Sequence, residues 1–304
     1  MKEEVAKAIE QGILTRRRLL VGLSRSDQER LLKMLFLDFF ANQHVILQRW
    51  SALTGQSAQV DTGYIAQFIA SIVLKEPGQG FRGKGDDLAD GSEVKSAANI
   101  SGVDRPRWNH NMGMPSDDEK RKRRGQRPAW QEYLNAPHVV YLLADRVVGS
   151  DPPAPIRVRV WCLDAARDEA WRGLLETFVR SRKDDQYNLQ LHPPVGYDDD
   201  VVVNTLGNLD FSEVLLLDAR IHLKSTGAHE ISWHRQLPES VIPIRGRSRA
   251  TPYGGRSSRP SRLTDASDLV ADMAVIPTLF PGVFSEAEES ALEEATRDEH
   301  SSDL

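Results

Sequence analysis

The chain has 304 residues, of which 40% are apolar, so it can bury one large core or two modest ones. Its single cysteine, Cys162, excludes an intrachain disulfide and argues against a cysteine-based zinc site. No apolar run reaches the roughly 18 residues of a transmembrane helix, and the acidic, amphipathic N-terminus does not resemble a signal peptide. These features predict a cytoplasmic protein with no membrane segment.

The formal net charge of −5 at first argues against a nucleic-acid partner, but the charges are unevenly distributed. Residues 120–124 read KRKRR, and residues 245–262 carry six arginines and no acid, whereas the last twenty residues are strongly acidic. Local patches govern binding to a polyanion more than the net charge does. The overall sign therefore does not exclude DNA.

Helices are predicted for the N-terminal region, residues 1–55. Ser26 and Glu29 have the spacing of a capping box, and the apolar run 31–40 follows them. A further helix is expected to begin at Asp61 and to end before EPGQG, whose proline and glycines cannot continue it.

A core is expected over residues 56–243. Residues 138–148 and 156–164 are strand candidates joined by GSDPPAP, as in a hairpin. Apolar residues recur at helical spacing from Trp171 to Val179. Helices followed by a mixed sheet with helices around it indicate an α/β or α+β fold. Residues 244–304 are predicted to form a flexible basic linker and an acidic C-terminal helix.

The stretch GKGDDLADGSEVKSA, residues 83–97, carries the predicted chemistry. Asp90-Gly91 is the strongest two-residue turn signal in the chain, because a type I′ turn needs positive φ at both positions. A hairpin around this turn would pair Leu88 with Glu93 and Asp86 with Lys95. Opposite residues share a face, so Asp86, Glu93 and Lys95 would converge.

Two neighbouring carboxylates and a lysine suit a divalent cation. Mg²⁺ takes oxygen ligands, which Asp86, Glu93 and the backbone carbonyl of Val94 could supply. Lys95 could hold the attacking water or stabilise charge on a phosphate. A one-residue change in the loop would put Asp87 in place of Asp86. The alternative without catalysis is a turn followed by a surface Glu-x-Lys pair.

This pattern resembles the PD-(D/E)xK nuclease superfamily, whose signature is an aspartate on one strand and (D/E)-x-K on the next. The resemblance implies that Asp86 or Asp87 binds Mg²⁺ with Glu93 and that Lys95 acts on the nucleophilic water. No proline precedes either aspartate, which departs from the motif.

A longer segment, RGKGDDLADGSEVKSAANISGVDRPRWNHN, followed by YLLADRV, RVWCLD and LQLHPP, is similar to type II restriction endonucleases of the MamI-type group. Membership would imply a central mixed sheet of four to five strands flanked by helices, a homodimer, and double-strand cleavage leaving 5′-phosphate and 3′-hydroxyl ends. A cognate DNA methyltransferase would be a functional partner.

Basic and amide side chains agree with a DNA partner. Arginine reads guanine and asparagine reads adenine in the major groove, and lysines hold phosphates. The candidates flank the proposed site and fill the following polar segment: Arg82, Lys84, Arg105, Arg107, Asn109, His110, Lys120, Arg121, Lys122, Arg123 and Arg124. For the 120–124 block, a solvated loop is an equal alternative.

Two other functions fit parts of the pattern. A repair or nicking nuclease of the same fold would use the same residues, and a non-catalytic DNA-binding regulator would use only the basic segments. The hairpin carboxylates weigh against the regulator, because without a metal they would repel phosphate.

Overall fold

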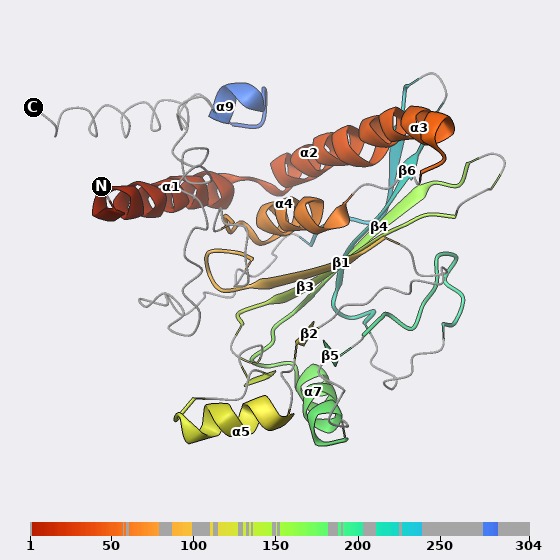
Figure 1. Cartoon of the computed structure of the whole chain (residues 1–304). Helices are drawn as coiled ribbons and strands as arrows, with labels where there is room; N and C mark the ends of the chain where they lie inside the picture. The colour runs from red at the N-terminus through yellow and green to blue at the C-terminus, as the bar shows by residue number, and fades with distance from the viewer. Residues whose placement is uncertain are drawn as a thin grey trace, which may run out of the picture. The chain divides into compact units, whose positions relative to one another are not determined.

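The computed structural model describes residues 2–56, 58, 61–78, 87–98, 110–111, 115–126, 130–131, 134, 136–147, 150, 153–181, 188–189, 191–202, 211–224, 227–238 and 276–284. They belong to two compact units, one made of Met1–Leu35, Gln67–Asp90 and Glu239–Leu304 and the other of Phe36–Ala66 and Gly91–Pro238. Figure 1 labels most of the helices and strands used below.

The predicted helical N-terminal region is confirmed. It comprises α1 (Lys2–Gly22), α2 (Arg25–Leu35), the π-helix η1 (Phe36–Asn42) and α3 (Gln43–Thr54). The predicted capping box is wrong by two residues. The amide of Asp27 donates to Ser24 Oγ (3.2 Å), and the amide of Ser24 donates to Asp27 Oδ2 (3.1 Å). Glu29 instead accepts a bond from Arg25 Nε at 3.1 Å.

Helix α4 (Thr62–Leu74) begins and ends as predicted. Asp61 Oδ1 accepts a bond from the amide of Gly63 at 2.9 Å, which caps the first turn. At the other end Lys75 has a φ of 56°, a left-handed conformation that stops the helix. In the first unit, Gln28 Nε2 ties α2 to the carbonyl of Ile72 at 2.6 Å.

The apolar contacts of the first unit connect its three chain segments. Leu23 and Leu31 form a cluster with Val283, which follows the short helix α9 (Ile276–Leu279). Two polar contacts also join these segments. Arg17 pairs with Glu76, and the Arg30 guanidinium donates to the carbonyl of Gly282.

The second unit is built on a five-stranded mixed sheet, which confirms the predicted fold class. Its strands are β1 (Glu93–Ala97), β3 (Val139–Asp145), β4 (Ile156–Leu163), β6 (Leu215–His222) and β7 (Glu230–Arg235), in the order β1-β3-β4-β6-β7. β1 pairs with β3 in parallel, and the other neighbours are antiparallel. The predicted hairpin of residues 138–148 and 156–164 is β3–β4.

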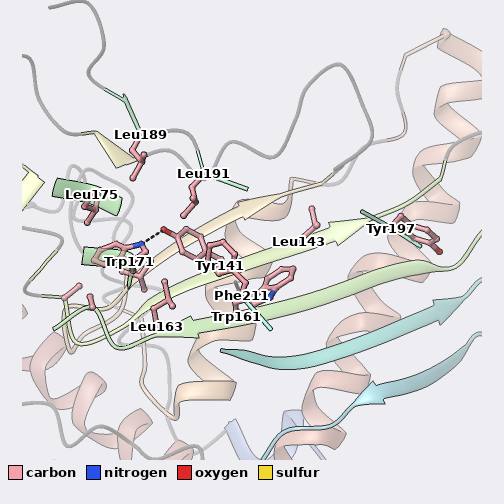
Figure 2. Close-up of a cluster of buried hydrophobic side chains, with 13 residues drawn as sticks. Tyr141, Leu143, Trp161, Leu163, Trp171, Leu175, Leu189, Leu191, Tyr197 and Phe211 are labelled. Atoms are coloured by element: carbon pink, nitrogen blue, oxygen red, sulfur yellow. Dashed lines mark hydrogen bonds between the residues drawn. The ribbon is translucent and has the colours of Figure 1, made fainter. Parts of the chain in front are cut away.

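One face of this sheet is covered by α7 (Glu169–Ser181), the helix predicted from its apolar spacing. Trp171 and Leu175 of α7 are fully buried against Tyr141 and Trp161 of the sheet. The indole Nε1 of Trp171 donates to the hydroxyl of Tyr141 at 3.1 Å, as the dashed line in Figure 2 shows. A buried indole thus keeps a hydrogen-bond partner inside an apolar cluster.

Two smaller features complete the second unit. A two-residue ladder joins β2 (His110–Asn111) to β5 (Asn188–Leu189) in antiparallel fashion. Helix α5 (Pro115–Arg123) carries four residues of the basic block in its last turn, so the block is helical where a loop was the alternative. Of the helices that are described, none is long and apolar enough to cross a bilayer.

Candidate active site on strand β1

Glu93 and Lys95 lie on the same face of β1 and touch each other. The ammonium of Lys95 donates to Glu93 Oε1. Their side chains are 12% and 23% exposed, so solvent reaches both groups but covers neither fully. The sequence prediction that these two groups share a face is therefore confirmed.

The alternation of β1 explains this placement. In the parallel register, Glu93 is opposite Val139 and Lys95 is opposite Tyr141, and partners in register share a face. Tyr141 belongs to the α7-covered cluster, so both charged groups lie on that face of the sheet. Val94, between them, is 8% exposed and faces the other way.

The backbone of β1 adds a possible oxygen ligand. The amide of Glu93 donates to the carbonyl of His138 at 3.0 Å, so the peptide groups of Glu93 point toward β3. In a parallel ladder the next residue points the opposite way. The carbonyl of Val94 is therefore directed away from β3, at the terminal strand of the sheet order.

The hairpin prediction is wrong in its pairing. Leu88 forms an antiparallel bridge with Gly78, and the amide of Ala89 donates to the carbonyl of Pro77 at 2.9 Å. The named strand partner of β1 is β3. The turn type also differs, because Gly91 has a φ of 92° but Asp90 does not have a positive φ. The predicted pairing of Asp86 with Lys95 lies outside the described residues.

The structure describes only one of the two candidate aspartates. Asp86 lies outside the described residues. Asp87 is half-buried, and its Oδ1 accepts a bond of 2.6 Å from the side-chain amide of Gln67 on α4. Both residues of this bond belong to the first unit. This partner of Asp87 was not predicted from the sequence.

Five of the eleven predicted DNA-contact residues lie outside the described residues, namely Arg82, Lys84, Arg105, Arg107 and Asn109. His110 begins β2, although its side chain is not described. On α5 and directly after it, Lys120, Lys122, Arg123 and Arg124 are exposed and Arg121 is half-exposed. Lys120 pairs with Asp117 at 3.1 Å.

A buried network of charges occupies the same face of the sheet, in a part that the sequence did not single out. Arg157 of β4 holds Asp218 of β6 through two bonds, from Nε at 3.0 Å and from Nη2 at 2.5 Å. Its Nη1 donates to the carbonyl of Tyr197 at 2.6 Å and to Asp199 Oδ1 at 2.9 Å. Figure 2 shows Tyr197 at the far end of the apolar cluster from Trp171.

Arg159, two residues along β4, is buried beside this pair. It lies 4.0 Å from Asp145 and donates to the carbonyl of Gly196 at 3.1 Å. Burial, with a contribution from the positive charge of Arg157, lowers the pKa of Arg159 to about 10. The pKa of Arg157 is raised despite burial, because Asp218 and Asp199 stabilise its charged form. This network fixes the turn of residues 196–199 to the sheet.

The groups that could carry out chemistry at this site lie on β1. The half-buried carboxylate and the outward backbone carbonyl are hard oxygen ligands, which suit Mg²⁺. The adjacent ammonium is a cation, which suits a phosphate. Within the described part of the chain, no three His, Cys, Asp or Glu side chains are grouped to hold a metal ion. The donors on β1 therefore need a further carboxylate, for which Asp86 and Asp87 are the nearest candidates in the sequence.

Comparison with known proteins identifies the family of the chain. The family model described as MamI restriction endonuclease matches residues 49–223. The chain is 63% identical over 285 residues to a protein of Microbacterium ammoniaphilum named type II restriction enzyme MamI, which covers 94% of this chain and 92% of the relative. No solved structure matches. The chain therefore belongs to the MamI restriction endonuclease family of type II restriction enzymes.

Proposed function

We propose that this type II restriction enzyme is Mg²⁺-dependent and hydrolyses DNA phosphodiesters at a short specific site to give 5′-phosphate and 3′-hydroxyl ends. The observation that carries the proposal is the contact of Lys95 with Glu93 on one face of β1. A carboxylate and an ammonium side by side are the groups that metal-assisted phosphodiester hydrolysis uses.

The metal would be held by Glu93, the carbonyl of Val94 and one of the two aspartates, Asp86 or Asp87. All are oxygen donors, and Mg²⁺ keeps several waters beside such ligands. When bound, Mg²⁺ would polarise the scissile phosphate and lower the pKa of a bound water. The ammonium of Lys95 would then hold the attacking water or stabilise negative charge on the phosphate.

Of the two aspartates, we favour Asp87 as the metal ligand, because Gln67 already orients its carboxylate. The side-chain amide of Gln67 donates to Oδ1 at 2.6 Å, which restricts rotation of the carboxylate. Partners that orient a ligating carboxylate contribute strongly to metal affinity.

Replacing Gln67 by leucine should raise the Mg²⁺ concentration for half-maximal cleavage by about tenfold, because Asp87 loses its orienting bond. The measurement is a Mg²⁺ titration of the cleavage rate. Gln43→Leu, on the described helix α3, is a control of the same chemistry and should titrate like the wild type. An unchanged titration for Gln67→Leu would instead point to Asp86.

DNA would be bound by the basic residues of α5 and of the polar segment before it. The exposed lysines and arginines of residues 120–124 suit phosphate contacts, so binding should weaken as salt rises. Arg82, Lys84, Arg105, Arg107, Asn109 and His110 remain candidates for phosphate or base contacts. We further propose a homodimer in the cytoplasm that presents one site to each DNA strand, with a cognate methyltransferase protecting the host sequence.

The test is cleavage of a plasmid library by the purified protein. With Mg²⁺ the expected products are discrete linear fragments whose ends carry a 5′-phosphate and a 3′-hydroxyl, and a chelator should abolish them. End-labelling and sequencing of the fragments identify the ends and the site. Nicked circles alone would favour a nicking enzyme, and salt-sensitive binding with no cleavage under any divalent ion would favour a regulator.

A further inference from the structure

The start of β1 is held by two contacts to His138, the residue directly before β3. Ser92 Oγ lies 3.4 Å from Nδ1 of the His138 ring, and both side chains are buried, with exposures of 0% and 5%. The carbonyl of the same His138 accepts the amide of Glu93 at 3.0 Å. His138 thus binds the backbone of Glu93 and the side chain of the residue before it.

We propose that Ser92 and His138 are positioning residues for Glu93, and that their contact sets the affinity of the site for its metal. The inference rests on the proposed function, in which Glu93 is a metal ligand. Neither residue touches substrate or metal in this role. By the alternation of the strand, Ser92 and Val94 face away from the side of the sheet that carries Glu93 and Lys95.

The geometry of β1 explains why such a contact is needed. Among the strands that the structure describes, β1 is terminal in the sheet order and pairs with β3 over five residues, of which Glu93 is the first. Strand ends fray unless they are tied, and fraying here would move a metal ligand. A slip of one residue would also turn Glu93 and Lys95 to the opposite face.

The buried hydroxyl of Ser92 and imidazole of His138 favour one register of β1 against β3. Polar groups in an apolar interior are costly unless they are hydrogen-bonded, so arrangements that separate Ser92 from His138 are penalised. In the observed register, which pairs Glu93 with Val139, the Ser92 hydroxyl and the His138 ring lie next to each other. The contact therefore favours one position of the Glu93 carboxylate over its alternatives.

The experiment is a Mg²⁺ titration of the cleavage rate for Ser92→Ala, together with DNA binding measured without metal. The expected result is a rise of about tenfold in the half-saturating Mg²⁺ concentration, with unchanged DNA binding, because only the ligand position is loosened. Ser92→Cys keeps the volume but bonds weakly, so it should fall between Ala and the wild type, and it replaces Ser92→Ala in the comparison if that variant does not fold.

A matched control lies in the same sheet. Ser232 of β7 bonds to Nε2 of His222 on β6 at 2.9 Å, at the end of the strand order opposite to β1. Ser232→Ala should leave the Mg²⁺ titration unchanged. If Ser92→Ala titrates like Ser232→Ala, the positioning role is overturned.

A further variant distinguishes failure of this inference from failure of the proposed function. Glu93→Gln should remove cleavage if Glu93 is a metal ligand. A Glu93→Gln enzyme that still cleaves would overturn the proposed site, whereas an inactive Glu93→Gln with a normal titration for Ser92→Ala would overturn only this inference.

Discussion

Lys95→Ala is expected to slow DNA cleavage by about 10²–10³-fold, the usual effect of removing one preorganised group that stabilises developing charge. The ammonium contacts Glu93 and the Lys95 side chain is only 23% exposed, so water replaces it poorly. The rate is measured in single-turnover cleavage at saturating Mg²⁺, and DNA binding is measured separately. Binding should change little, because we propose that the basic residues of α5 and of the polar segment before it make most of the phosphate contacts.

An ion pair of the same type provides the control. Lys224, after β6, pairs with Glu230 at the start of β7, where both side chains are well exposed. Lys224→Ala should cleave at the wild-type rate. Lys95→Arg should restore the charge without restoring full activity, because a planar guanidinium does not reproduce a compact ammonium. Wild-type cleavage by Lys95→Ala would remove this lysine from the mechanism.

Asp218→Ala should lower the free energy of unfolding by about 3–5 kcal/mol, because it leaves the Arg157 guanidinium buried without its principal counter-ion. Each side chain of this pair is only 6% exposed, and Arg159 lies buried nearby. Urea denaturation followed by circular dichroism measures the change. The loss should appear as a lower midpoint with a similar slope.

Glu176→Ala is the corresponding surface control. Glu176 and Arg180 form an i,i+4 pair on α7 with exposures of 42% and 81%, and such pairs contribute less than about 1 kcal/mol. Replacing both partners of the buried pair, as in Arg157→Met with Asp218→Leu, should recover part of the loss because no uncompensated charge remains. An Asp218→Ala protein as stable as Glu176→Ala would show that the buried pair contributes little.

Local patterns predicted the elements that local interactions build. The apolar spacing around Trp171 identified α7, and GSDPPAP between two apolar runs identified the β3–β4 hairpin. β1 was placed correctly as a strand, and the shared face of Glu93 and Lys95 follows from strand alternation alone. Its partner was not predictable, because parallel pairing with β3 joins segments far apart in the chain, whereas Asp90-Gly91 suggested a neighbour.

The error at Ser26 and the unpredicted burial of the β4 arginines have physical causes too. Ser24 and Asp27 offer the same capping chemistry as Ser26 and Glu29, so the sequence holds two overlapping helix starts. The alternation of arginine and valine in β4 is typical of a strand with one wet face. Arg157 and Arg159 are nevertheless buried, because carboxylates from β3 and β6 meet them there, and no single stretch of sequence reveals that convergence.

The place of β1 at the margin of the sheet bears on how the protein avoids self-association. Among the described strands β1 ends the sheet order, and natural proteins use charged side chains to discourage the pairing of an extended chain with such a strand. Here Glu93 and Lys95 supply such charges on a strand of only five residues. The pair that we assign to catalysis therefore also makes this margin a poor template for a foreign strand.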